Sequence, residues 1–430
     1  MADTLGMAKM GGGAGMSRPT AGLACALVLA LSTTGTPAGG VSVTLPLGDP
    51  DLVETRTTEV LAEGVTLTRI VRGTDPAAEK DIGTTTRGPW RVNVLAIDPT
   101  IASGSLQASY GTDLATVEPV SAIASAAGAL VAVNASFFTF TADRRYPGDP
   151  VGLGLYGGSL LSEPSTTAPA EVAFLVDSRN NSARMDSLTW QGQMVNRRTR
   201  AALPLEHLNH RPVVPKGCRD LKNPRRCFRS GDGVRFASSF GQKTPAGPGV
   251  EVVLGRHGCV VRREMTRGTE LKPQQSSVQA TGRQSVRLLR LTQDGCLAFK
   301  SVLRDTAGNW VETGDWMSGV NGRFRLTVAG RSVVPRGTTE LFERNPRTIA
   351  GRTREGVILL VTIDGRQSTS VGTTLDETAA VALSLGMRNA VNLDGGGSTT
   401  MVANGALVNS PSGDGQERAV GDALVFVPAP

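Results

Sequence analysis

The 430-residue chain is poor in aromatic side chains, which make up 4% of its residues. It also has no Lys/Arg run interleaved with aromatic residues that could stack on bases. Proteins that bind nucleic acid usually combine a basic stripe with such side chains or with a recognisable reading motif. The composition therefore disfavours nucleic-acid binding. The modest net charge of +7 instead favours attraction to anionic polymers of a cell surface.

Long apolar runs are also missing, since no segment approaches the length of about 18 to 20 residues that spans a bilayer. The run from Ala21 to Leu31 follows two basic residues and precedes a small-residue cleavage site at 36–38. This order predicts a signal peptide at residues 1–38 and an exported, soluble mature protein without a stable membrane span. Met16 is an alternative start, and a lipid anchor on Cys25 is a less favoured alternative.

Cysteine is scarce as well, and removal of the signal leaves an even set of four. In an oxidising compartment two disulfides are expected. Three pairings are possible, and the favoured one joins Cys218 to Cys227 and Cys259 to Cys296. A zinc site is the disfavoured rival, because the chain has no C-x-x-C and only three histidines. Those histidines are His207, His210 and His257.

Strand patterns dominate the mature chain, and two strand-helix-strand units stand out. In the second unit a strand at 357–364 precedes a helix at 375–385 and a strand at 390–394. If the two strands are parallel, Asp364 and Asp394 emerge at the same sheet edge.

The helix of the second unit has recognisable ends. Thr374 and Glu377 form a capping box at its start, and Gly386 closes it. Periodicity, turn residues and composition predict further segments. They are a first unit of strand 90–98, helix 119–127 and strand 129–134, an antiparallel meander at 151–195, a disulfide-pinned insertion at about 204–240, and strands at 250–261, 286–291 and 324–328.

These patterns predict an α/β fold with one mixed-sheet domain at residues 64–430, preceded by a lead-in at 39–63. Asp394 is its most informative residue, because a short apolar strand delivers this carboxylate directly into three glycines. Glycine lets the backbone take positive φ and lets a ligand approach the main-chain N–H groups. An ordinary hairpin turn follows separately at Asn404 and Gly405, so the glycines favour a ligand site.

Several motifs together resemble the phosphodiester glycosidase family, from about Gly64 to Val427. They are VNASFF at 133–138, NPRTIAG at 345–351, TIDGRQ at 362–367, the helix start at 372–377, NLDGGGSTTM at 392–401 and ERAV at 417–420. Family members often carry glycine where this chain has Ala135, and serine where it has Thr399. The resemblance implies a hydrolase that cleaves the glycosyl–phosphate bond of substrates like α-N-acetylglucosaminyl-1-phosphodiesters.

The chemistry assigns roles within these motifs. A carboxylate can stabilise or trap the cationic state at the anomeric carbon, and Asp394 is the first choice, with Asp364 as its acid or base partner. Arginines can hold the phosphate bidentately. The expected substrate-binding residues are Arg347, Arg366, Arg418, Thr348, Gly395, Gly396, Gly397 and Ser398.

Several of these residues also have a structural role as an alternative. Glu377 and Asn134 are further catalytic candidates, although a helix cap and a buried structural amide explain them equally well. Phe137 and Phe138 are interpreted as core residues. Ca²⁺ or Mg²⁺ held by Asp364 or Asp394 is left open by the sequence.

Two other functions are also consistent with the sequence. One is an exopolysaccharide or cell-wall glycosidase or lyase without a phosphate requirement. The other is a non-catalytic cell-wall glycan-binding protein.

Overall fold

The computed structural model describes residues 44–166, 171–413 and 415–429. The signal peptide expected at 1–38 lies outside these ranges. The described residues form 25 strands and three α-helices. Within them, none of the helices combines the length and the apolar composition needed to cross a bilayer.

The predicted single mixed α/β sheet is wrong, because the fold is mostly β and its strands form four separate sheets. Among the described strands the pairs are antiparallel, except that β12 (His207–Leu208) runs parallel to β13 (Gly233–Phe236). Fully apolar strands such as 357–364 suggested a parallel sheet covered by helices. Here they are buried on one face by a second sheet and on the other by a single helix.

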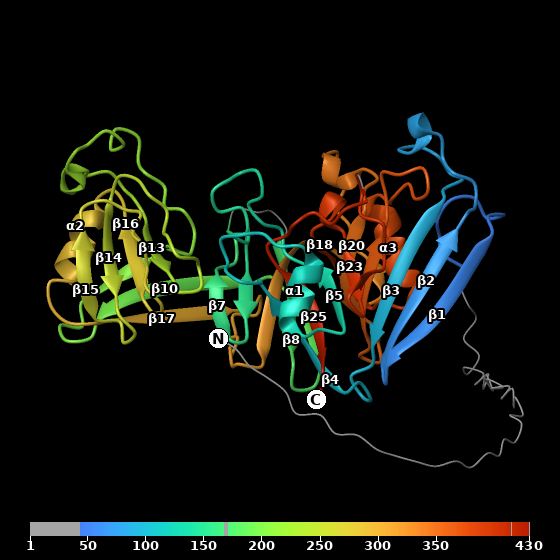
Figure 1. Cartoon of the computed structure of the whole chain (residues 1–430), viewed down its shortest axis with the longest axis horizontal. Coiled ribbons are helices and arrows are strands. Elements are labelled where there is room, and N and C mark those ends of the chain that lie inside the picture. Colours follow the sequence, from blue (N-terminus) through green and yellow to red (C-terminus); the bar gives the residue numbers. More distant parts are fainter. Residues whose placement is uncertain (1–43, 167–170, 414, 430) are drawn as a thin grey trace, which may run out of the picture. The chain divides into compact units, whose positions relative to one another are not determined.

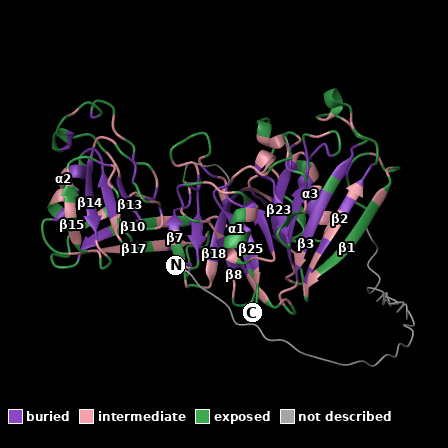
Figure 2. Ribbon diagram, viewed as in Figure 1, coloured by how far each residue is buried: buried purple, intermediate pink, exposed green. Residues whose placement is uncertain are grey.

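The largest sheet has 12 strands and contributes strands to the candidate site described below (Figure 1). Its path begins at an edge strand that is mostly exposed, while the strands behind it are mostly buried (Figure 2). The path runs through β1 (Glu54–Ala62), β2 (Val65–Arg72), β3 (Trp90–Ile97), β21 (Ile358–Ile363), β20 (Arg347–Arg352), β22 (Asn389–Asn392), β18 (Met317–Val328), β6 (Gly154–Tyr156) and β7 (Ser159–Ser162). Off this path lie β8 (Glu171–Asp177), β9 (Ser182–Asp186) and β19 (Arg331–Ser332).

A five-stranded sheet packs against one face of the 12-stranded sheet. A shared core that includes Leu95, Val133, Leu360 and Phe426 joins the two sheets. Helices cover the outer faces, α1 (Val120–Ala127) on the smaller sheet and α3 (Leu375–Ser384) on the larger. The smaller sheet contains β24 (Ala406–Leu407), β23 (Met401–Ala403), β5 (Val131–Asn134), β25 (Ala423–Pro428) and β4 (Gly104–Ser109).

The remaining two sheets build a third core with α2 (Gln284–Leu291). The strand predicted at 286–291 is wrong, because these residues belong to that helix. Leu288 and Leu291 are buried while Arg287 and Arg290 are exposed, which is the period of a helix rather than of a strand. The sheets contain β10 (Thr189–Asn196), β11 (Ala202–Leu205) and β17 (Leu297–Arg304), and then β12, β13, β16 (Ser276–Ala280), β14 (Val250–Leu254) and β15 (Val260–Glu264). Short 3-10 turns are η1 (Glu79–Asp81), η2 (Pro224–Arg226), η3 (Glu340–Phe342) and η4 (Gly396–Ser398).

The second strand-helix-strand unit is confirmed in its local parts. Both β21 and β22 are antiparallel to β20, which lies between them, so the two are mutually parallel. Asp364 and Asp394 therefore leave the sheet at the same edge. The capping box of Thr374 and Glu377 is present, and Gly386 follows α3 with φ of 82°.

The first unit and the meander form only in part. β3 lies in the large sheet and β5 in the smaller one, so the two strands around α1 do not pair. Within 151–195, β6 pairs with β7 and β8 with β9, but β8 joins β18 instead of β7. Long-range pairing has replaced the local order.

Two further predictions are confirmed. The disulfides join Cys218 to Cys227 and Cys259 to Cys296. Asn404 and Gly405, with φ of 50° and 75°, form the two-residue turn between β23 and β24.

We expect the Cys259–Cys296 disulfide to stabilise the fold more than the Cys218–Cys227 disulfide. Its cysteines are 37 residues apart, compared with 9 for the other pair. Closing the longer loop removes more entropy from the unfolded chain, by about 1 kcal/mol. Guanidinium unfolding of the two Cys→Ala double variants measures this difference. Equal or reversed losses of unfolding free energy would contradict it.

Candidate functional site

The glycine loop after β22 is folded as a tight turn on the end of β20. Gly396 has φ of +60° and donates its N–H to the carbonyl of Pro346 at 2.9 Å. A Cβ on Gly395 would lie 2.8 Å from that same carbonyl oxygen. Glycine is therefore required both for the backbone angle and for the close approach of the two segments.

Asp394 occupies the start of this loop with a largely buried carboxyl group. Its backbone N–H donates to the carbonyl of Ala135 at 2.9 Å. Burial raises the pKa of Asp394 to about 6, although the hydrogen bond from Ser398 and the charge of Arg418 act to lower it. The group is therefore poised to change its protonation state under mildly acidic conditions.

Asn134 fixes the position of Asp394 from the smaller sheet. Its Nδ2 donates to the Asp394 carbonyl at 2.6 Å, and its Oδ1 accepts from the Thr348 hydroxyl at 2.7 Å and from the Thr400 N–H at 3.1 Å. The side chain is completely buried. Asn134 and Thr348 thus tie together the strand ends around the loop, and neither side chain is exposed to a ligand.

Arg418 lies directly on the glycine loop. Its Nη2 donates to the Ser398 hydroxyl and lies 3.9 Å from a carboxylate oxygen of Asp394. A Cβ on Gly397 would come within 2.9 Å of Nη1, so glycine makes room for the guanidinium. The ring of Phe140 covers the group at 4.7 Å, and Nε has no hydrogen-bond partner among the described residues.

Arg366 approaches the same loop from the end of β21. Its Nε and Nη2 donate to Asn345 Oδ1 at 3.0 and 2.6 Å, and Nη2 also contacts Glu340 at 3.2 Å. A Cβ on Gly396 would lie 3.5 Å from Nη1. Two guanidinium groups therefore flank the glycine loop. Burial lowers the pKa of Arg418, and the positive charge of Arg366 adds to this effect.

Arg347 is placed differently from the other two arginines. Its side chain is 1% exposed, and it donates to the backbone carbonyls of Thr373, Leu341 and Glu343 at 2.9, 2.8 and 2.6 Å. Burial lowers the pKa of Arg347 to about 10. The guanidinium is occupied in holding the segments around β20 together.

Asp364 and Glu377 also have their carboxylates occupied. Asp364 accepts from Asn409 Nδ2 at 2.9 Å and from the Ser410 N–H at 3.1 Å, and burial raises its pKa to about 6. Glu377 completes the helix cap and forms an ion pair with Arg344 at 2.6 Å. Asp364 thereby anchors the segment that follows β24.

A divalent cation does not fit these surroundings. Both oxygens of Asp364 accept hydrogen bonds from protein donors, Arg418 lies 3.9 Å from Asp394, and Arg366 lies beside the same glycine loop. Within the described ranges no group of three or more His, Cys, Asp or Glu side chains is arranged to hold a metal ion.

A buried network around Asp422 was missed by the sequence analysis. Asp422 accepts from the Ser136 N–H and hydroxyl at 2.6 Å each and from the Tyr156 hydroxyl at 2.7 Å. Burial raises its pKa, and its charge in turn acts to raise the pKa of Asp394. The sequence places Asp422 four residues after Arg418, close to the ERAV motif. Nothing in the local sequence indicated that its side chain is buried.

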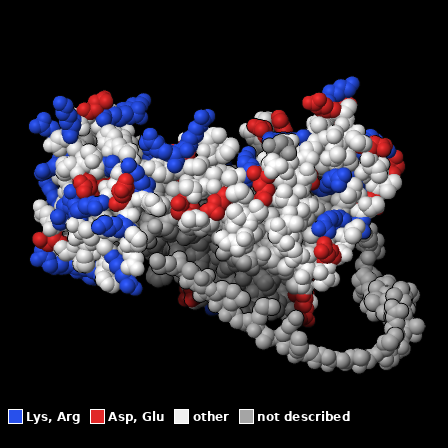
Figure 3. Space-filling model, viewed as in Figure 1, with Lys and Arg blue, Asp and Glu red and all other residues white. Residues whose placement is uncertain are grey.

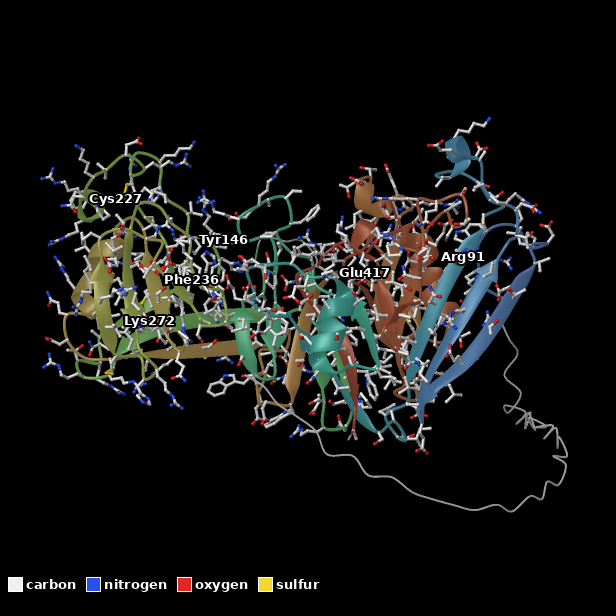
Figure 4. The ribbon with its side chains drawn as sticks, viewed as in Figure 1. Arg91, Tyr146, Cys227, Phe236, Lys272 and Glu417 are labelled. Atoms are coloured by element: carbon white, nitrogen blue, oxygen red, sulfur yellow. A yellow bond between two sulfur atoms is a disulfide. The ribbon has the colours of Figure 1, made fainter. Side chains whose placement is uncertain are left out.

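Glu417, next to Arg418, has a structural role. Its carboxylate accepts from the Ser121 N–H at 3.0 Å, at the start of α1 (Figure 4). The N-cap position of α1 is Pro119, which provides no side-chain cap. A carboxylate from a distant segment therefore caps this helix.

A separate cavity of about 840 Å³ lies beside the 137–151 loop. His210 lines it and contacts Asp149 at 2.7 Å and Ser162 at 3.2 Å, an arrangement similar to a hydrolase triad. Burial lowers the pKa of His210, but the charges of Asp149 and Glu163 outweigh this effect and raise it to about 9. Ser162 is completely buried and donates its proton to the Gly152 carbonyl, so it is unsuited to act as a nucleophile.

Residues 250–427 match the phosphodiester glycosidase family. VNASFF at 133–138 lies outside that match, although Asn134 contacts the glycine loop inside it.

Two curated relatives share short segments with the chain. It is 40% identical over 87 residues to the uncharacterized SPbeta prophage-derived protein YomE of Bacillus subtilis, covering 20% of this chain and 13% of YomE. It is 46% identical over 66 residues to the N-acetylglucosamine-1-phosphodiester alpha-N-acetylglucosaminidase of Bos taurus, covering 15% of this chain and 12% of the enzyme. The matches thus span only a small part of both relatives.

Solved structures resemble the chain over most of its length. A candidate exported protein from Burkholderia pseudomallei K96243 is 26% identical with a TM-score of 0.74, over 89% of this chain and 98% of that one. A hypothetical protein from Synechocystis, 20% identical with a TM-score of 0.61 over 84% and 62% of the two chains, shares the fold. The two disulfides agree with an extracellular location. The resemblance predicted from the sequence is confirmed over residues 250–427, which match the phosphodiester glycosidase family.

Proposed function

We propose that the protein is an exported hydrolase that cleaves the glycosyl–phosphate bond of sugar phosphodiesters, including α-N-acetylglucosaminyl-1-phosphodiesters. The observation that carries this proposal is the placement of two guanidinium groups and one carboxyl on a single glycine loop. Arg366 and Arg418 flank Gly396 and Gly397, and Asp394 begins the loop. The family match to residues 250–427 supports the same reaction class.

Asp394 is the group we assign to the anomeric centre. Hydrolysis breaks the bond between the anomeric carbon and the phosphate oxygen, and the electron pair leaves with the phosphate. The carbon becomes cationic, and an adjacent carboxylate stabilises or traps it before water supplies the hydroxyl. A hydrogen bond from Ser398 and the strand β22 that precedes the loop hold Asp394 in place.

The arginines are assigned to the departing phosphate. The departing group is a phosphate monoester, which is a weak base, so it needs positive charge and N–H donors more than a proton as it leaves. Arg366 and Arg418 provide that charge beside the glycine loop. Arg418 has an Nε–H without a partner in the described chain, and Phe140 shields one side of its guanidinium from water.

The other predicted residues are assigned positioning roles in this proposal. Asn134 and Thr348 hold the backbone at Asp394, and Asp364 holds the segment at Asn409. Arg347 holds three backbone carbonyls around β20. Each acts through the loop rather than on the substrate.

We expect the purified mature protein to hydrolyse chromogenic sugar-1-phosphodiesters but not the matching phosphate-free glycosides. The Asp394→Asn variant should lose at least about a thousandfold in kcat/KM, because a neutral amide cannot stabilise the cationic centre. Its thermal unfolding temperature should not fall, since the substitution removes a buried charge. Steady-state hydrolysis and thermal unfolding measure the two effects.

The substrate panel separates the rival functions. Activity on the plain glycosides alone would replace this proposal with a phosphate-independent glycosidase. Silence across the panel would favour a glycan-binding protein. A fully active Asp394→Asn variant would exclude the assigned role of that carboxylate.

The arginines should divide into a substrate-binding and a structural class. We expect Arg418→Lys to lower kcat/KM for the phosphodiester by about a hundredfold without lowering stability, because lysine keeps the charge but loses the bidentate fork. Arg347→Gln should instead cost about 2 to 4 kcal/mol of unfolding free energy, because it leaves three carbonyls without their donor. Kinetics and denaturant unfolding of both variants test this division. Similar behaviour of the two variants would refute it.

Activity should depend on pH through Asp394. Only the carboxylate stabilises the cationic centre, so kcat/KM should fall as pH decreases below a pKa of about 6 and level off above it. Removing the cation with Arg418→Gln should move this limb to higher pH, because Arg418 lowers the pKa of Asp394. The pH profile of kcat/KM measures both effects.

Asp364 has a similar pKa and provides the matched control. The Asp364→Asn variant should keep the acid limb, even where its overall activity is reduced. Loss of the limb in that variant would assign it to Asp364 instead.

A further inference from the structure

The basic residues of the chain are concentrated in one segment. Residues 197–300 contain 21 of the 45 Lys and Arg residues but only 7 of the 38 Asp and Glu residues. The rest of the chain therefore has an excess of acids, and the modest net charge of +7 conceals a strongly basic part. Figure 3 shows Lys and Arg side chains gathered over α2 and the sheet of β12 to β16.

The densest cluster lies on the loop at residues 213–231, which we call the disulfide loop. It contains six exposed cations and one acid, Asp220. In the part of the chain that the structure describes, none of the six forms an ion pair with a carboxylate. The six are Lys216, Arg219, Lys222, Arg225, Arg226 and Arg229.

Helix α2 continues this cluster. The Arg229 carbonyl accepts from the Arg283 N–H at 2.8 Å, and α2 packs against η2 of the disulfide loop. Arg283, Arg287 and Arg290 are spaced four and three residues apart, so they lie on one exposed face of the helix. We call these three arginines and the six loop cations the basic face.

The basic face is held in a defined conformation. The Cys218–Cys227 disulfide closes the loop, and the Asn223 side chain caps η2 by accepting from the Arg225 N–H at 3.0 Å. Figure 4 shows Cys227 on this loop. Phe228, beside the disulfide, is 82% exposed and adds an apolar contact. Cations gathered this closely repel one another. Binding of a polymer with regularly spaced negative charges would relieve that repulsion.

We propose that the basic face binds a polyanionic glycan whose repeating unit carries phosphate. Binding of a phosphate polymer follows from the charge and geometry of the face alone. The choice of a sugar-phosphate polymer rests on the proposed function, because the same polymer would present glycosyl–phosphate bonds to the Asp394 site. A nucleic acid is less well matched, since Phe228 is the sole exposed aromatic residue of the disulfide loop.

The test measures binding of the mature protein to fluorescent poly(glycerol phosphate) by anisotropy at several salt concentrations. The variant Lys222→Gln, Arg225→Gln, Arg226→Gln and Arg229→Gln should bind at least about tenfold more weakly at moderate salt. The slope of log K against log salt should fall by up to about four, because each cation releases about one counterion. Far-UV circular dichroism confirms that the variant is folded.

The matched control removes the same number of exposed cations from outside the segment. The variant Arg331→Gln, Arg336→Gln, Arg354→Gln and Arg388→Gln has the same net charge and should retain wild-type affinity. Equal weakening in both variants would overturn the proposal, because binding would then follow net charge. So would a wild-type protein that does not bind poly(glycerol phosphate).

Two further comparisons separate the ligand class and the proposed function. Single-stranded DNA with the same number of phosphates should bind more weakly than poly(glycerol phosphate), and tighter DNA binding would overturn the choice of a glycan. The loop variant should hydrolyse a small chromogenic phosphodiester at the wild-type rate. A wild-type protein that binds the polymer but hydrolyses nothing would refute the proposed function and leave the binding face intact.

Discussion

The buried amide of Asn134 is the contact on which the site depends. It joins the carbonyl of Asp394, the hydroxyl of Thr348 and the N–H of Thr400, and so connects strand ends from two sheets. Each of these groups would be left unpaired in the interior without it, which is costly. These buried hydrogen bonds therefore fix both ends of the tight glycine loop.

Burial divides the charged residues of the motifs into two classes. Arg347 and Asp364 lie within recognisable motifs, yet their side chains are surrounded by protein partners. Arg366 and Arg418 reach the glycine loop and remain partly exposed. An ion that must bind a ligand has to keep donors available, whereas a buried ion must satisfy them within the protein. Membership of a motif alone does not separate these two demands.

The basic face and the Asp394 loop are separate features of the fold. The glycine loop has one carboxylate and two guanidinium groups at short range, and its glycines make room for them. The basic face instead presents many cations on an exposed surface, where attraction to a polymer is long-range and weakened by salt. Under the two proposals, one polymer would bind the basic face and present its glycosyl–phosphate bonds to the Asp394 loop.

Local chemistry is what the sequence alone determined. The capping box at Thr374, the turn at Asn404, the favoured disulfide pairing and the glycine loop each depend on residues close in sequence or on few alternatives. The tertiary structure decided that the fold is mostly β and which arginines face the loop. These outcomes depend on strand pairing and burial between distant segments, and periodicity within one segment contains no record of them.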